Sequence, residues 1–400
     1  MEPKKTKFSI LRLSYFICIR TLKTNKMSEF QPFEMERYMS IHEMAVKYNM
    51  SESGVHPMLL RELLELEDGS LERMLEVELN YSHANGIPLL RENISKMYDG
   101  ATRDNVLVTV GGIEANFNAL TTILSAGEEM VLMVPNYMQV WGVAKNHGIK
   151  IKTFPLLHEK NWAPDLDKLE SIVSNDTKLI AICNPNNPTG YILTGDEMDA
   201  IVKIADRVGA WILADEVYAG AEQLTEVQTP SFFGLYERVI ATGSMSKAYG
   251  LPGLRTGWAV GPEDMIDQIW ARHEYTTLST AMLSNTLAAL ALSEQVRPTI
   301  IQRTRDYIRK GYPILVDWMK GHGDLLSAVP PQAAAIAFIK YKMDINSTDF
   351  VTRLINEKSV LIIPGDQFGM DHYVRISYGL PKDYLLGGLK GISEVIESLR

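Results

Sequence analysis

The sequence predicts an α/β fold: a large domain with a mostly parallel sheet between helix layers, and a small α+β domain. From about residue 100, short apolar runs rich in β-branched residues alternate with longer helical patterns, which is typical of parallel sheets. The runs are apolar on both faces and end in turn residues, as expected for strands covered on both sides by helices. Four hundred residues also exceed what one compact core usually holds, so we expect a second, smaller domain.

These patterns define the expected elements in chain order. The large-domain strands are VLVTV from 106, EMVLMVP from 129, KLIAICNP from 178, AWILADEVY from 210, RVIATGSMSK from 238 and GWAVG from 257. Helical patterns occupy 113–125, 137–147 and 196–208, and a long helical stretch covers 263–321. In the small domain we expect strands at AAIAFIKY, VLIIPG and YVRISYG, and helices near 347–357 and 381–399.

The change of pattern also predicts the domain boundaries. Residues 28–78 are expected to form an N-terminal arm with helices near 34–78 that join the small domain, while 79–300 form the large domain and 301–400 the small one. Residues 1–27 carry seven basic residues and one acid, and we expect a disordered extension or leader. A transit segment or a signal anchor is the alternative for this stretch.

Composition excludes several classes of function. The formal net charge of -9 argues against a nucleic-acid partner, and no apolar run is long enough to span a membrane. Two cysteines, Cys18 and Cys183, are too few for a disulfide framework, and the eight histidines lack the spacing of a metal site. We therefore expect a cytoplasmic protein without a bound metal, whose Cys183 is a buried small residue.

Five polar motifs follow the expected strands in a fixed order. They are VTVGGIEANF (108–117), NPNNPTG (184–190), DEVY (215–218), SMSKAYGLPGLRTGW (244–258) and VRISYG (374–379). Taken singly, each has a plain structural explanation as a turn, a strand end, a surface ion pair or a solvated loop. Open α/β sheets bind ligands at the carboxyl ends of their strands, so we expect the motifs to meet there.

Together the motifs supply the groups that pyridoxal phosphate requires, namely an amine for a Schiff base, an anion cradle, an acid and hydrogen-bond donors. Lys247 supplies the amine, and Asp215 would keep the pyridine nitrogen protonated. Asn187 and Tyr218 would bond the phenolic oxygen. The hydroxyls, the guanidinium and the helix-start amides of the phosphate cradle come from Ser244, Ser246, Arg255, Gly111, Gly112 and Ile113. Positive charge near Lys247 would help to keep its amine unprotonated.

In this order and spacing, the motifs resemble those of the class I and II aminotransferases, a fold-type I family of pyridoxal-phosphate enzymes. The resemblance covers about residues 78–400 and implies an aspartate-aminotransferase-like fold. In that family a lysine in S-x-S-K carries the Schiff base and a phosphate-binding arginine follows eight residues later, matched here by Lys247 and Arg255. The family's turn asparagine and its aspartate and tyrosine three apart match Asn187, Asp215 and Tyr218.

The resemblance also implies roles for residues outside these motifs. An aromatic residue that stacks on the cofactor ring matches Tyr137, and a tyrosine that reaches the neighbouring subunit's phosphate matches Tyr81, which implies a homodimer with shared active sites. Arg375, beside Asn187, matches the arginine that clamps the substrate's α-carboxylate. The planar fork of an arginine suits a carboxylate better than a lysine does, which supports this assignment independently.

The expected activity is amino-group transfer between an L-amino acid and a 2-oxo acid by a ping-pong mechanism, with Lys247, Asp215 and Tyr218 as the catalytic residues. A β-lyase, or a cyclase or oxidase of a guanidino amino acid, is the alternative on the same fold. An effector-sensing domain of a transcription regulator is a further alternative, but residues 28–77 are acidic and contain no basic recognition helix.

Three stretches depart from the family pattern or cannot be aligned with it. The usual glycine-rich segment before the first small-domain strand appears as PPQAAAIAF (330–338), without glycine. The segment KYNMSESGVHPMLLREL (47–63) is expected to line the substrate entrance, but its Gly54 does not align clearly with the family glycine there. The stretch HEYTTLSTAMLSN (273–285), where substrate-selecting residues often lie, carries no arginine for a dicarboxylate.

Overall fold

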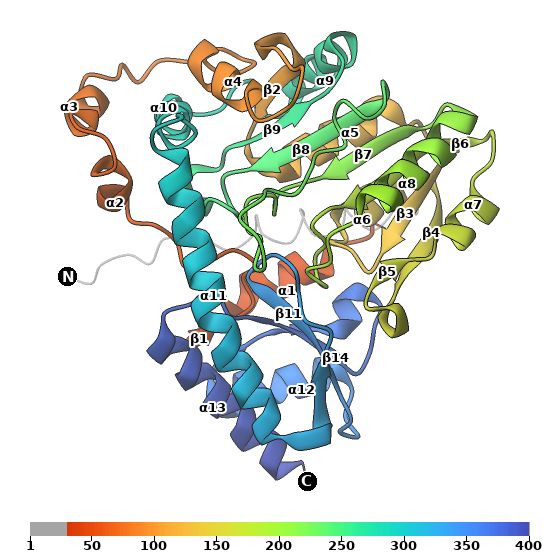
Figure 1. The fold of residues 1–400 in the computed structure, drawn as a ribbon, viewed down its shortest axis with the longest axis vertical. Coiled ribbons are helices and arrows are strands. Elements are labelled where there is room, and N and C mark those ends of the chain that lie inside the picture. The colour runs from red at the N-terminus through yellow and green to blue at the C-terminus, as the bar shows by residue number, and fades with distance from the viewer. Residues whose placement is uncertain (1–29, 400) are drawn as a thin grey trace, which may run out of the picture. The chain divides into compact units, whose positions relative to one another are not determined.

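The computed structural model describes residues 30–399, and residues from Phe33 onward form one compact unit. Within this unit, an eight-stranded sheet flanked by helices accompanies a four-stranded antiparallel sheet, so the predicted α/β fold class is confirmed (Figure 1). The predicted leader, 1–27, lies outside the described residues. The boundaries proposed after residues 78 and 300 stay predictions, because the contacts do not divide the unit there. Along residues 30–399 no helix is both long and apolar enough to cross a membrane.

The large sheet has the strand order β2-β9-β8-β7-β6-β3-β4-β5. Its strands are β2 (Val106–Thr109), β3 (Glu129–Val134), β4 (Lys150–Leu157), β5 (Ala163–Pro164), β6 (Thr177–Cys183), β7 (Trp211–Asp215), β8 (Val239–Ser244) and β9 (Gly257–Val260). The central pairs from β4 through β3, β6 and β7 to β8 are parallel, while β9 and β5 pair antiparallel with their neighbours. The sequence analysis missed β4 because its KIKTFPLL pattern is half polar, as suits a strand near the sheet edge.

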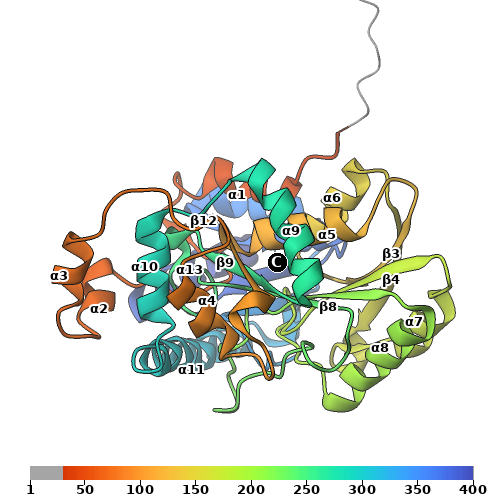
Figure 2. The same ribbon diagram turned by 90° about the horizontal axis from the view of Figure 1, so that it is seen from above.

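Helices lie on both faces of this sheet. The helices formed along residues 30–399, including those of the small-sheet part, are α1 (Glu34–His42), α2 (Leu60–Leu64), α3 (Ser70–Leu75), α4 (Pro88–Ser95), α5 (Gly111–Ile123), α6 (Gln139–Asn146), α7 (Leu166–Ile172), α8 (Gly195–Val208), α9 (Glu263–Thr276), α10 (Met282–Ala291), α11 (Arg297–Gly321), α12 (Ser347–Arg353) and α13 (Lys382–Ser398). On β3, Met130 and Leu132 pack into one core with α5, α6 and α9, while Val131 and Met133 pack into another with α7 and α8. Figure 2 shows these two helix layers on opposite sides of the strands. This double burial explains why the strands are apolar on both faces.

The predicted single helical stretch over 263–321 is wrong: it forms three helices, α9, α10 and α11. Leu278 takes a left-handed φ of 66°, which helix geometry does not allow, so the chain turns after α9. Pro298 then lies in the first turn of α11, where a proline costs no helical hydrogen bond. Figure 1 shows α11 running from the large sheet to the small one.

The small sheet has the order β10-β11-β14-β13, with antiparallel pairs throughout. Its strands are β10 (Leu326–Ala328), β11 (Ile336–Tyr341), β13 (Ile363–Pro364) and β14 (Tyr373–Ser377). The N-terminal segment joins this part through β1 (Tyr48–Asn49), which pairs in parallel with β12 (Val360–Leu361). The strand β14 carries Arg375, directly opposite Phe338 on β11.

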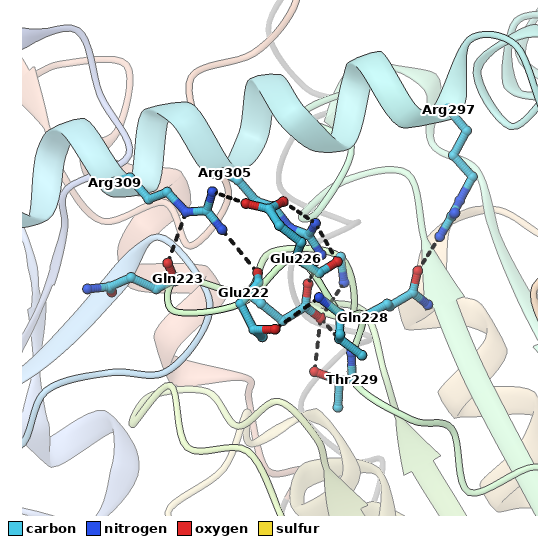
Figure 3. Close-up of polar contacts among 11 residues, drawn as sticks. Glu222, Gln223, Glu226, Gln228, Thr229, Arg297, Arg305 and Arg309 are labelled. Carbon is cyan, nitrogen blue, oxygen red and sulfur yellow. Dashed lines mark hydrogen bonds and ion pairs between the residues drawn. The ribbon is translucent and has the colours of Figure 1, made fainter.

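Arginines fasten α11 to the segment that follows β7 (Figure 3). Arg305 forms a buried ion pair with Glu222 at 2.5 Å, and the same carboxylate accepts hydrogen bonds from the backbone and hydroxyl of Thr229 at 2.8 and 2.9 Å. Arg309 donates to the backbone carbonyl of Gln223 at 3.0 Å. A buried charge is stable only when it is paired and hydrogen-bonded in this way. The network therefore fixes the path of the chain just beyond the end of β7.

Glu114, a buried residue in the first turn of α5, ties this helix to α9. Its carboxylate accepts hydrogen bonds from the Val110 backbone, the His273 ring, and the hydroxyls of Thr276 and Thr277. Burial alone would raise the pKa of Glu114, but the four hydrogen bonds outweigh it and lower the pKa to about 2. The carboxylate thus holds the start of α5 in place.

We expect Glu114 to make stability depend on pH in the acid range. Its folded-state pKa lies below the ordinary glutamate value of 4.5, so its contribution to stability is present above pH 4.5 and is lost as the pH falls towards 2. The shift corresponds to about 3 kcal/mol at neutral pH. Urea unfolding should show that Glu114→Gln is less stable than wild type at neutral pH and loses less stability on acidification. Glu274→Gln, at an exposed position of α9, should follow wild type; identical pH profiles for all three would contradict the assignment.

Candidate active site

A cavity of about 320 Å³ lies at the carboxyl ends of β7 and β8, where the start of α5 and part of α1 also form its wall. Most of the predicted site residues line it: Gly112, Ile113, Tyr137, Asn187, Asp215, Tyr218, Ser244, Ser246, Lys247, Arg255 and Arg375. These residues come from segments up to 263 positions apart, counted from 112 to 375. The fold therefore gathers all five motifs at one place.

The hydroxyls and the guanidinium of the expected phosphate cradle converge on one side of this cavity. The Ser244 hydroxyl lies 3.0 Å from that of Ser246 and accepts from the Ser246 backbone N–H at 3.0 Å. Arg255 donates to the Ser246 hydroxyl at 3.4 Å. The first turn of α5 adds free backbone N–H groups and the positive end of its dipole. Such a group of donors is suited to a phosphate dianion.

Glycines make this close approach possible. Gly111 has a φ of 76°, and a Cβ there would lie 2.7 Å from the Arg255 guanidinium. Across the sheet edge, a Cβ on Gly257 would lie 2.3 Å from the carbonyl carbon of Gly111. The backbone contact at Gly257 is too short for any side chain, and at Gly111 the left-handed φ strains one and its Cβ would displace the Arg255 guanidinium, so both positions favour glycine. Gly111 is not part of the cavity wall, but it lies against Arg255, which is.

Asp215 is the last residue of β7 and faces the cavity. Asn116, one turn into α5, donates from Nδ2 to Oδ2 of Asp215 at 2.9 Å, and the Thr242 hydroxyl donates to Oδ1 of Asn116 at 2.8 Å. Thr242 thereby turns the amide so that its NH₂ group faces the carboxylate. Burial raises the pKa of Asp215, while the Asn116 hydrogen bond and the nearby Lys247 oppose that rise. The carboxylate is therefore poised to pair with a cation in the cavity.

Lys247 follows β8 and extends into the cavity, with 28% of its side chain exposed. The carboxylate within ion-pair distance is that of Glu52, at 3.9 Å. Gly54, two residues further on, packs against the same turn, since a Cβ there would lie 2.9 Å from the Ser246 carbonyl oxygen. The segment around Gly54 thus fits directly against the lysine backbone, a role that the sequence did not reveal.

Arg375 is 2% exposed, and its guanidinium lies against the ring of Phe368 at 5.6 Å. One nitrogen donates to Oδ1 of Asn187 at 2.9 Å, and another donates to the backbone carbonyl of Ser51. Its Nε has no hydrogen-bond partner among the described residues. Burial lowers the pKa of Arg375, although nearby acidic groups oppose this shift. A buried guanidinium with a free donor is prepared to bind an anion.

Two tyrosines complete the cavity wall. The buried Tyr218 donates to the Ser53 hydroxyl at 2.8 Å, and burial raises its pKa. Tyr137 donates from its hydroxyl to Glu36 at 2.7 Å, which fixes its ring beside α1. By contrast, Tyr81 is 81% exposed and lies outside the cavity wall, so its expected reach into a second subunit stays a prediction.

Several residues of the site were missed from the sequence. Asn116 stands inside the motif GGIEANF, four residues after Gly112, so helical spacing could have placed it on the cavity side. No local signal marks α1, which reaches the site only through the tertiary fold. Glu52 and Ser53 belong to the segment 47–63 that was expected at the substrate entrance, but neither was named as a site residue. The missed residues that line or support the cavity are Met35, Glu36, Met39, Ser40, Glu43, Glu52, Ser53, Asn116, Gln139, Val217, Thr242 and Pro252.

The remaining sequence-based expectations can also be located. Cys183 lines the cavity and is buried, and burial raises its pKa well above the ordinary range, as fits a packed thiol. Residues 273–285 contribute nothing to this chain's own cavity wall. In the glycine-free segment 330–338, Ala334 takes a left-handed φ of 66°. The backbone bend there is thus made without the usual glycine.

Comparisons with known proteins agree with this geometry. Residues 63–392 match the family described as aminotransferase class I and II. The chain is 28% identical to capreomycidine synthase of Streptomyces vinaceus, over 90% of this chain and 91% of that protein, and 27% identical to aspartate aminotransferase of Pyrococcus horikoshii, over 80% and 83%. A solved structure of a PLP-dependent aminotransferase from Streptococcus suis superposes with a TM-score of 0.87 at 29% identity, covering 93% of this chain and 99% of that one. The chain belongs to the class I and II aminotransferase family.

Proposed function

We propose that this enzyme transfers the amino group of an L-amino acid to a 2-oxo acid by a ping-pong mechanism. As in its family, its cofactor is pyridoxal phosphate. The observation that carries the proposal is the convergence in one cavity of an amine, a half-buried carboxylate and two guanidinium groups, from Lys247, Asp215, Arg255 and Arg375. No smaller set of these groups would serve the reaction.

The residues present fit this cofactor. A Cβ at Gly111 would fill the cradle in which Arg255, Ser244 and Ser246 would hold the phosphate. Asp215 would face the pyridine nitrogen, and Asn187 and Tyr218 would bond the phenolic oxygen. In the same proposal, the Tyr137 ring covers the cofactor ring, and the backbone of Gly112 and Ile113 contributes to the phosphate cradle.

Each residue then has a chemical task. When bound, the cofactor supplies an electron-withdrawing ring that stabilises negative charge at the substrate's Cα. Arg375 binds the α-carboxylate, using the Nε that lacks a partner among the described residues, and Asn187 orients its guanidinium. Lys247 would hold the cofactor through its amine, and the same amine would act as the general base that removes the Cα proton of the substrate. Asp215 keeps the ring nitrogen protonated throughout.

One comparison supports retaining an alternative to amino-group transfer. The relative at 28% identity is named a synthase rather than an aminotransferase, so membership of the family does not by itself determine the reaction. A β-lyase, or a cyclase or oxidase of a guanidino amino acid, would use the same anchoring residues. These reactions differ from transfer in the fate of the amino group and the side chain.

The fate of the amino group therefore tests the proposal. The holoenzyme is incubated with each common amino acid and with 2-oxoglutarate or pyruvate, and the new amino acid, the ammonia and any cyclic product are quantified. Stoichiometric formation of glutamate or alanine supports amino-group transfer. Release of ammonia, or a cyclised product without transfer, would instead assign the enzyme to the alternative.

We also propose that two chains assemble into a homodimer. Large apolar side chains are exposed on α2, α3, α4 and the stretch leading into α10: Leu59, Leu60, Leu71, Leu75, Leu79, Tyr81, Leu89, Leu278 and Leu283. Helices α2, α3 and α10 lie near one another in both Figure 1 and Figure 2. A surface of this kind favours burial against a second copy, which would bring Tyr81 towards the other chain's site. Sedimentation should show two chains; a monomer at all concentrations would contradict this.

The expected location is the cytoplasm. The chain has only two cysteines, and Cys183 is a buried free thiol, which suits a reducing compartment. The substrates are small molecules, and we propose no nucleic-acid or membrane partner, in keeping with the net charge of -9. Fractionation of cells that express the full chain would test this location.

A further inference from the structure

Three glutamates line the outer part of the active-site cavity. Glu36 and Glu43 come from α1 and the residue that follows it, and Glu52 comes from the segment that packs against Lys247. Met35 and Met39 of the same helix complete this wall with apolar surface. The side of the cavity away from the phosphate cradle is therefore both acidic and partly apolar.

Within residues 30–399 these carboxylates have no close cationic partner apart from the 3.9 Å contact between Glu52 and Lys247. Glu36 accepts one hydrogen bond, from Tyr137, and forms no ion pair within residues 30–399, and the same part of the chain offers Glu43 no cationic partner. Glu52 reaches Lys247 only at 3.9 Å, with 49% of its side chain exposed. Burial, and then repulsion from Glu52 and Glu36, raise the pKa of Glu43. Three like charges around one opening are costly unless a cation joins them.

In the proposed function, each cationic group of the described cavity wall binds either the cofactor or the substrate's α-carboxylate, and none neutralises the glutamates. Lys247 and Arg255 serve the cofactor, which leaves Arg375 as the positive group on the substrate side. Its buried Nε lacks a partner in the described structure and points independently to a bound anion. Glu52 and Glu36 lie close enough to act on the charge of Arg375. The substrate side thus pairs one buried positive group with several negative ones.

We propose that the amino donor is an α-amino acid with a positively charged side chain, and that Glu36, Glu43 and Glu52 recognise that charge. This inference rests on the proposed function, because it takes Arg375 as the carboxylate site. The zwitterionic end of the substrate sits between Arg375 and Lys247, and its side chain extends along Met35 and Met39 towards the glutamates. A dicarboxylate would instead place its second carboxylate among like charges, which disfavours it.

A matched pair of ligands tests the charge directly. Citrulline has the length and shape of arginine but a neutral urea group, so the difference between them isolates the charge. Isothermal titration of the holoenzyme with L-arginine, L-citrulline, L-lysine and L-glutamate should rank both cationic amino acids above the others, with arginine at least about tenfold tighter than citrulline. Comparing arginine with lysine shows whether a guanidinium or an ammonium group is preferred. Equal affinity for arginine and citrulline, or tightest binding of glutamate, would overturn the inference.

Variants then test the residues. In Glu36→Gln/Glu43→Gln the preference for arginine over citrulline should fall towards one, whereas Glu34→Gln, exposed on the same helix and outside the cavity wall, should keep the wild-type preference. An unchanged preference in the double variant would contradict recognition by these glutamates. If the double variant does not fold, the wild-type comparison of arginine with citrulline decides.

The two proposals fail separately. If arginine binds preferentially but no amino group is transferred to a 2-oxo acid, the proposed transfer reaction is wrong and recognition of the charge is still supported. Amino transfer that proceeds equally from citrulline and arginine would remove charge recognition alone.

Discussion

Replacing Lys247 by alanine is expected to lower kcat by a factor on the order of 10⁴, because a positioned general base typically contributes 10² to 10⁴ and the anchoring amine is lost as well. Among residues 30–399 no other lysine lines the cavity, so no neighbouring amine of this part of the chain can take over. The side chain is partly exposed, and its ion-pair partner Glu52 is exposed too, so the substitution should leave folding stability almost unchanged. Loss of activity should therefore occur without loss of structure.

The measurement combines turnover, thermal unfolding and chemical labelling. Borohydride reduction of the wild-type holoenzyme should fix the cofactor covalently to the peptide that contains Lys247, and the alanine variant should give no such peptide. Lys203→Ala, at an exposed position of α8, serves as the control and should keep full activity and labelling. Labelling of a different lysine, or substantial turnover by the Lys247 variant, would refute the central assignment.

The fold and the inner part of the site could be predicted because their signals are local. A buried strand is apolar on both faces wherever it occurs, and the site residues lie at or just beyond strand ends: Asp215 ends β7, and Lys247 lies three residues after β8. The carboxyl ends of parallel strands meet by construction, so Asp215, at the end of β7, lies next to β8. The inner site residues could therefore be predicted without knowledge of most long-range contacts.

The outer part of the site could not be predicted for the opposite reason. Glu36 and Glu52 reach the cavity because α1 and residues 51–54 fold back over it, nearly two hundred positions from Lys247, counted from 52 to 247. Their own sequence pattern is that of an ordinary amphipathic arm. The break at Leu278 was missed similarly, since its left-handed φ belongs to a leucine and not to a glycine that would have marked a turn.

Replacing Asp215 by asparagine is expected to lower activity while stability stays the same or rises slightly. The amide oxygen can still accept the hydrogen bond from Asn116, and the bond that is lost is the long one from the Val217 backbone N–H at 3.3 Å, so the local structure should persist. The amide carries no negative charge to hold a proton on the cofactor's ring nitrogen. Loss of that electrostatic contribution should lower kcat by about 10² to 10³, the effect of removing one well-placed polar group from an active site.

The stability argument has the opposite sign because burial raises the pKa of Asp215, which means that its charged form is disfavoured in the folded protein. The neutral amide avoids that cost, so the cofactor-free variant should unfold at the same temperature as wild type or slightly above it. Thr242→Val is the matched control: it removes only the hydroxyl that orients Asn116, and should cost about tenfold in kcat or less. A charge that is desolvated for function lowers the free energy of unfolding. Removing that charge should therefore lower activity without lowering stability. If the asparagine variant were less stable but fully active, Asp215 would be a structural residue and the electrostatic role assigned to it would be wrong.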